Sequence, residues 1–343
     1  MRNIHSGPYP GLLLGLILTL LGGSVLAGQV NVYSSRHYDA DQLIYEAFTA
    51  ATGIEVRLLE GNSDQLLERI RREGIASPAD VLITVDAGRL WRAEQLGLLQ
   101  PVDSDILNDR IPEFLRHPDG LWFGFSQRLR LIYYSKDRFD PALVSGYEDL
   151  VRPELAGRVC IRSSNNIYNL SLLASMIETR GVQQTEAWAR GLVANLARPP
   201  EGGDTDQIRG VAAGECDVAV ANHYYYLRLA NSDSAADRAV ADAVGIIFPN
   251  QDDRGTHVNV GGAGVVANAP NRANAVRFLE FLASDEAQEI FAGANFEYPV
   301  VEGVRLHESL EAWGELRFDQ LNIDALGRNN PEAVRLTDRV GWR

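Results

Sequence analysis

Positive charge is scarce in this chain of 343 residues, which has 32 Lys and Arg against 46 Asp and Glu and a net charge of −14 at pH 7. No stretch gathers the basic residues into a stripe. Proteins that bind nucleic acid or an anionic membrane surface rely on such a basic patch. The composition therefore argues against both kinds of partner and is compatible with a cationic ligand.

Cysteine is scarce as well. Only Cys160 and Cys216 occur, and the sequence contains no CxxC pair and no Cys/His spacing typical of a zinc site. Two cysteines in an exported protein can form one disulfide. The sequence alone leaves open whether these two are bonded or are buried thiols.

Long apolar runs are absent after the N-terminus, where residues 11–21 are almost entirely apolar. Val25 and Ala27 fit the small-residue cleavage site of a secretory signal peptide. A transmembrane anchor is the alternative, but the run is short and no Lys/Arg cluster follows it. We expect residues 1–27 to be a signal peptide. The mature chain, beginning near Gly28, would then be periplasmic and would not span the membrane.

Catalytic motifs are also missing. The sequence has no Gly-x-Ser-x-Gly elbow, no phosphate-binding loop and no HExxH. Glu60 could form an acid/base pair with Asp80 or Asp86, but the spacing of these residues in the sequence does not support a catalytic pair. We therefore expect a binding protein and not an enzyme.

Short apolar strands alternate with amphipathic helices in two parts of the chain. This order predicts an α/β fold with parallel strands and helices on the sheet faces. The strands are expected at residues 30–33, 54–58 and 79–84, and then, after Pro153, at 157–162, 216–221 and 243–249.

Two longer extended segments, residues 121–134 and 256–266, can each cross between two lobes. The second is rich in glycine, which permits the backbone adjustment that a hinge needs. We therefore predict a two-lobed clamshell joined by two extended hinge strands. The expected first lobe comprises residues 28–126 and 262–303, and the expected second lobe comprises 127–261, with a C-terminal helical segment, 304–343, packed on it.

Tyrosines follow three of the predicted strands. In open α/β sheets, ligands bind outside the carboxyl ends of the strands. Loops that leave these ends in two facing lobes would line one cleft, while Tyr226 is expected to point away and pack. The residues expected in the cleft are His37, Tyr38, Tyr168, Tyr224 and Tyr225.

Several phenols and an imidazole in one cleft suit a hard, highly charged cation, and Fe(III) fits best. A phenol has a pKa of about 10 in water, but a trivalent ion can hold it as phenolate. Magnesium and calcium would favour carboxylates and carbonyls, and zinc would favour Cys or more His. The alternative is an aromatic platform for an organic solute such as a polyamine or sugar, since a cation over an aromatic face is favourable.

Four segments resemble the periplasmic ferric-ion-binding proteins of ABC importers. They read VYSSRHY (32–38), LEGN (59–62), SSNNIYN (163–169) and ANHYY (221–225). The similarity runs in the same order over about residues 29–301. The stretches 275–282 and 297–300 are similar too, although many solute-binding proteins share them.

This resemblance implies the type II periplasmic binding-protein fold and the capture of Fe(III) for a membrane permease and its ATPase. We expect the chain to act as a monomer. The matching positions imply His37, Tyr38, Tyr168, Tyr224 and Tyr225 as metal ligands. Glu60 is a further candidate for the metal or its surroundings. Arg36 and Arg128 are candidates for binding an anion such as carbonate or for balancing phenolate charge.

Overall fold

The computed structural model describes residue 1, residues 28–36, residue 38 and residues 40–343. The predicted signal peptide and His37 lie outside these described residues. Within them, no helix is both long and apolar enough to cross a membrane.

The first lobe begins with a parallel sheet in the strand order β2-β1-β3. Its strands β1, β2 and β3 agree with the three strands predicted for this part of the chain. Helix α3 and the short elements that follow it were not predicted. The elements are β1 (Gln29–Ser34), α1 (Asp41–Thr52), β2 (Glu55–Glu60), α2 (Ser63–Glu73), β3 (Val81–Thr84), α3 (Ala87–Gln95), β4 (Leu99–Gln100) and α4 (Asp105–Arg110).

Two long strands join the lobes, as predicted. They are β5 (Phe123–Ser135) and β9 (Val258–Val266), which pair antiparallel with each other. The N-terminal half of β5 pairs with β9, and its C-terminal half pairs with the second-lobe strands. Because β9 also runs antiparallel to β3, the sheet is mixed and continuous, in the order β2-β1-β3-β9-β5-β7-β6.

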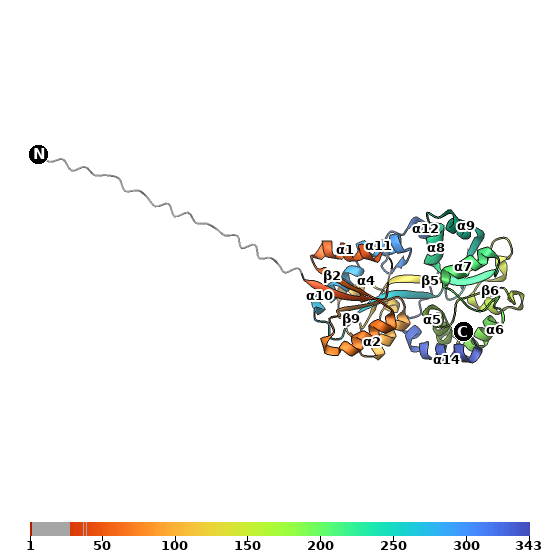
Figure 1. Cartoon of the computed structure of the whole chain (residues 1–343), viewed down its shortest axis with the longest axis horizontal. Helices are drawn as coiled ribbons and strands as arrows, with labels where there is room; N and C mark the ends of the chain where they lie inside the picture. Colours follow the sequence, from red (N-terminus) through yellow and green to blue (C-terminus); the bar gives the residue numbers. More distant parts are fainter. Residues whose placement is uncertain (2–27, 37, 39) are drawn as a thin grey trace.

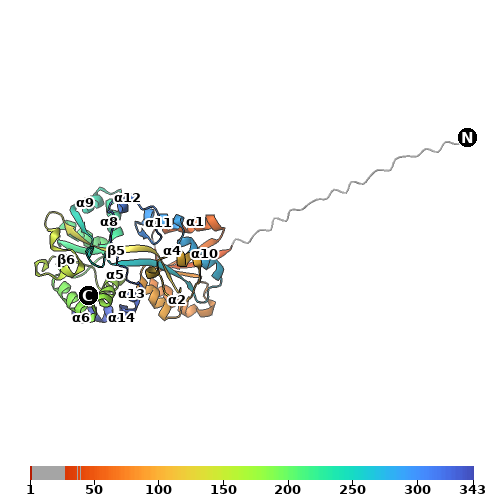
Figure 2. The ribbon, with the colours of Figure 1, turned by 180° about the vertical axis from the view of Figure 1, so that it is seen from behind.

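The second lobe lies on the other side of β5 (Figures 1 and 2). Its strands β6 and β7 are parallel, and Cys160, the last residue of β6, forms a disulfide with Cys216 just before β7. The elements are β6 (Val159–Cys160), α5 (Ile167–Arg180), α6 (Val182–Ala194), α7 (Asp204–Ala213), β7 (Val218–Asn222), α8 (His223–Ala230), α9 (Ala235–Ala243) and β8 (Val244–Ile247).

After β9 the chain returns to the first lobe through α10 (Arg272–Leu282), α11 (Asp285–Asn295) and β10 (Tyr298–Pro299). Both helices pack against α1, and β10 pairs with β5. Figure 1 shows α1, α2, α10 and α11 grouped together, apart from α6 to α9.

The C-terminal segment contributes α12 (Glu308–Glu311), α13 (Asp324–Arg328) and α14 (Asn330–Val340). Helix α14 packs on α5 and α6. Leu336 of this helix and Trp342, two residues after its end, are buried in the second-lobe core. Helix α13 contacts both α3 and α5 and so bridges the two lobes. The predicted residue boundaries of the lobes stay a prediction.

Candidate functional site

A cavity of about 550 Å³ lies between the lobes. It brings together four of the residues singled out in the sequence: Tyr38 and Glu60 from the first lobe, and Tyr168 and Tyr225 from the second. Its other polar lining residues are Ser35, Asn62, Ser63, Arg89, Arg162 and Asn166.

The second-lobe tyrosines lie in the first turns of helices, and not in loops as the sequence suggested. Tyr168 is the second residue of α5. Asn166 caps this helix, because its side-chain oxygen accepts a hydrogen bond from the Tyr168 backbone N–H at 3.0 Å. Tyr224 and Tyr225 follow the first residue of α8, which begins directly after β7. The prediction of loops was wrong because both helices start within a few residues of their strands.

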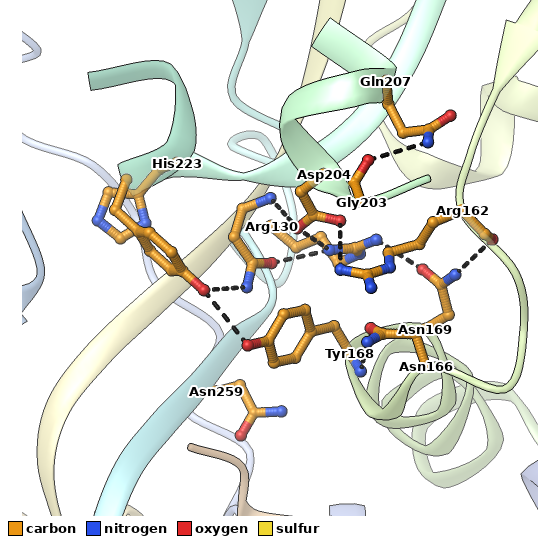
Figure 3. Close-up of polar contacts among 12 residues, drawn as sticks. Arg130, Arg162, Asn166, Tyr168, Asn169, Gly203, Asp204, Gln207, His223 and Asn259 are labelled. Atoms are coloured by element: carbon orange, nitrogen blue, oxygen red, sulfur yellow. Dashed lines mark hydrogen bonds and ion pairs between the residues drawn. The ribbon is translucent and has the colours of Figure 1, made fainter. Parts of the chain in front are cut away.

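The phenols meet where these two helices begin (Figure 3). The Tyr224 hydroxyl donates toward that of Tyr168 at 3.5 Å, and it accepts from the Asn222 amide at 3.3 Å. The ring centroid of Tyr224 lies 4.4 Å from that of Tyr225 and 6.2 Å from that of Tyr38. Tyrosines from both lobes therefore form one cluster.

Burial raises the pKa of the phenols of Tyr168, Tyr224 and Tyr225 above the ordinary value. The negative charge that neighbouring tyrosines would carry raises the pKa further, while the Arg128 guanidinium opposes the rise for Tyr168 and Tyr224. These phenols therefore stay protonated at neutral pH unless a cation binds among them, because a bound ion reverses the local electrostatics.

Arginines surround the tyrosine rings. The guanidinium carbon of Arg228 lies 4.4 Å from the ring centroid of Tyr38, 5.1 Å from that of Tyr224 and 6.0 Å from that of Tyr225. The guanidinium carbon of Arg128 lies 5.8 Å from the ring centroid of Tyr38 and 5.5 Å from that of Tyr224. Arg228 was missed in the sequence, because helix α8, which places it one turn after Tyr224, was not predicted.

Arg36 and Arg128 both face a buried carboxylate, that of Glu297. Their nitrogens lie 3.1 Å and 2.6 Å from its two oxygens, and Arg36 also forms a two-point ion pair with Asp41. Burial alone would raise the pKa of Glu297, but the two guanidiniums hold it at about 2. The candidate anion-binding arginines are thus already engaged by carboxylates of the protein, while still lying beside the tyrosine rings.

The sequence also singled out Glu60, Tyr226 and His37. Glu60 is exposed and lines the cavity. Tyr226 packs away from the cluster with its ring stacked on that of Tyr133 at 5.6 Å, which confirms that prediction. His37 belongs to the part of the chain that the structure does not describe.

A second group of metal-binding residue types lies where the first lobe meets helix α13. Ligand atoms of Glu94, His117 and Asp324 come within 4.8 Å of one another. The His117 Nδ1 accepts from the Asp119 backbone N–H, so a neutral ring carries its proton on Nε2, 3.3 Å from Glu94. That nitrogen is then a donor to the carboxylate and has no lone pair for a metal. Asp324 in turn pairs with Arg328. This cluster is an internal hydrogen-bond and ion-pair network.

Comparisons with known proteins agree with the fold. Residues 44–317 match the model of a family described as bacterial extracellular solute-binding proteins. The chain is 55% identical over 316 residues to Iron uptake protein A2 of Synechocystis sp., covering 92% of this chain and 90% of that protein. It is 27% identical over 344 residues to the Fe(3+)-binding periplasmic protein of Serratia marcescens, covering 99% of each.

A solved structure of a Trichodesmium protein in complex with iron and citrate ligands has a TM-score of 0.89 to this structure. The two are 54% identical, and the match covers 92% of this chain and 100% of that one. The similarity confirms the predicted two-lobed, type II binding-protein fold.

Proposed function

Because the chain belongs to the bacterial extracellular solute-binding protein family, we propose that it is the iron-binding component of an ABC importer. It captures Fe(III) in the interlobe cavity and delivers the ion to a membrane permease driven by an ATPase. The observation that carries this proposal is the convergence of Tyr38, Tyr168, Tyr224 and Tyr225 from two lobes.

The chemistry of the cluster favours a trivalent cation. Hard oxygen donors suit hard metals, and several phenolates together offset the charge of Fe(III). Tyr38, Tyr168, Tyr224 and Tyr225 would supply the phenolate oxygens, with His37 from the first lobe. Glu60 lines the same cavity and is a further carboxylate ligand or a partner of the bound ligands.

The arginines around the site support binding of an accompanying anion such as carbonate. Arg89 and Arg162 line the cavity, and Arg162 also lies 5.8 Å from the ring centroid of Tyr168. A guanidinium binds a carboxylate-like anion through two parallel hydrogen bonds. Because Glu297 engages Arg36 and Arg128, these two arginines do not hold the anion. They lie beside the tyrosine rings and balance phenolate charge instead.

The proposed setting follows from the family and from the N-terminal sequence. Residues 1–27 would direct export and be removed, and the mature monomer would act in the periplasm. We propose lobes of residues 28–126 with 262–303 and of 127–261, with residues 304–343 on the second. The relatives are named as iron uptake and iron-binding proteins, in agreement with the prediction that the chain is not an enzyme.

The visible spectrum tests the proposal. Fe(III)-phenolate complexes absorb visible light, so titration of the mature protein with Fe(III) in a weak chelator and bicarbonate should give a charge-transfer band that saturates near one iron per chain. A colourless protein without saturable iron binding would contradict the proposal. It would favour an organic solute such as a polyamine or sugar, which a thermal-shift screen of polyamines would then examine.

A further inference from the structure

Two buried polar side chains outside the cavity connect the second-lobe tyrosine helices to the rest of the molecule. Helix α5 carries Tyr168, and helix α8 carries Tyr224 and Tyr225. Each helix makes such a contact within about one turn of its tyrosine. Figure 3 labels His223, at the start of α8, and Asn259, on β9.

The first connection is His223, which is fully buried. Its Nδ1 accepts from the backbone N–H of Leu129 on β5 at 3.1 Å, and its Nε2 lies 2.7 Å from the carbonyl oxygen of Phe296 at the end of α11. Because a backbone N–H only donates and a carbonyl oxygen only accepts, Nδ1 carries a lone pair and Nε2 carries the proton, so the ring is neutral. One imidazole therefore fixes the start of α8 to a crossing strand and to the first lobe.

The second connection is Asp86, which is fully buried at the start of α3. The Ser171 hydroxyl on α5 lies 2.9 and 3.0 Å from its two oxygens, and the Asn259 amide of β9 donates to it at 2.6 Å. Ser171 is three residues after Tyr168 and faces the same side of α5. The carboxylate thus joins the first lobe, a crossing strand and the Tyr168 helix.

These contacts fix position because their groups are buried. A buried donor or acceptor that loses its partner cannot be compensated by water, so small displacements are penalised. The crossing strands β5 and β9 carry one partner of each connection. A rotation of one lobe relative to the other would therefore strain or break these contacts unless the tyrosine helices moved as well.

We propose that His223 and Asp86 are positioning residues that set where the second-lobe tyrosines stand relative to the first lobe. The inference rests on the proposed function for its ligand, Fe(III), whereas the positioning itself is a property of the iron-free protein. Neither side chain lines the cavity or binds the ion.

Four variants of the full mature chain test the proposal. His223→Phe removes both ring nitrogens, whereas His223→Gln keeps one acceptor and one donor. Ser171→Ala removes the contact of α5 with Asp86. Ser175→Ala is the matched control, since Ser175 is equally buried on α5 but its hydroxyl donates to the Leu172 carbonyl of the same helix.

The iron-bound readout is the charge-transfer band together with competition against a chelator. His223→Phe and Ser171→Ala should lower iron affinity by about 10- to 100-fold, as loss of groups that orient metal ligands does, and should shift the band. His223→Gln should recover most of the affinity, and Ser175→Ala should match the wild type. A change confined to the melting temperature, with band and affinity unchanged, would overturn the proposal.

The iron-free readout separates this inference from the proposed function. Spin labels at Ala50→Cys on α1 and Ala236→Cys on α9, both exposed positions, report the interlobe distance by double electron–electron resonance. We expect His223→Phe and Ser171→Ala to broaden or displace the distance distribution, and Ser175→Ala to leave it unchanged. If the wild type binds no iron, the proposed function fails, and these distances alone decide the present inference. Unchanged distributions in both variants would refute it.

Discussion

The hydroxyl oxygens of Tyr168 and Tyr224 lie 3.5 Å apart although the residues are 56 positions apart in sequence. They start two different helices, and both side chains are at least nine-tenths buried. Two ionised phenols this close would repel each other strongly without a cation beside them. The pair is therefore stable as two neutral phenols or as two phenolates sharing a metal ion.

Tyr168→Phe and Tyr224→Phe should each weaken Fe(III) binding by more than about 100-fold, since loss of a direct ligand exceeds the effect of losing an outer partner. The fold should survive, because phenylalanine fills nearly the same volume. Chelator competition measures the affinity, and the melting temperature reports the fold. Tyr226→Phe is the control, since that ring stacks on Tyr133. Wild-type affinity in both ligand variants would refute the assignment.

Iron binding should release protons. The pKa values of Tyr168, Tyr224 and Tyr225 are raised, first by burial, so these phenols are protonated in the iron-free protein at neutral pH and must lose their protons to bind. About three protons should therefore leave per ion from these groups, and affinity should fall as pH falls. Calorimetry in buffers of different ionisation enthalpy counts the protons, with the same ferric chelate titrated into buffer as the blank. Release of none would show that phenolates are not the ligands.

Glu297→Gln should destabilise the protein by about 3–5 kcal/mol, the usual effect of removing one partner of a buried ion pair. The carboxylate lies between the guanidiniums of Arg36 and Arg128, and all three side chains are buried. Urea unfolding measures the loss. Glu68→Gln, which removes an exposed carboxylate beside Arg71 and Arg72, should change stability little. Equal stability of the two variants would contradict this account of the buried triad.

The elements that local pattern specifies could be predicted from the sequence. The strands β1, β3 and β7 are short apolar runs, and the crossing strands β5 and β9 are long extended ones, so alternation and length identify them. Helix α8 was missed because its first turn holds His223 and three tyrosines, which are residue types of only moderate helix propensity. It also begins directly after a strand, without a capping side chain at Asn222.

The tyrosine ligand set could be proposed from a family resemblance, but its surroundings could not. The Arg36–Glu297 contact joins residues 261 positions apart, and no local pattern specifies such a pair. Arg228 belongs to no motif of the sequence, and only folding places it over rings from both lobes. Likewise, His223 lies in the segment 221–225, and no local pattern specifies the contacts of its two nitrogens with Leu129 and Phe296.

Acid should weaken the fold through His223. Burial lowers the pKa of His223 to about 4, below its ordinary value of about 6.5. A depressed histidine pKa means that the unfolded chain binds the proton more readily, so the contribution to stability is complete above pH 6.5 and is lost as pH falls toward 4. In that range the stability advantage of the wild type over His223→Gln should shrink by about 1.4 kcal/mol per pH unit. Urea unfolding of both proteins at several pH values measures this difference, and His257 is present in both, so its own titration cancels. An advantage that stays constant from pH 6.5 to 4 would show that the imidazole is not held neutral between Leu129 and Phe296.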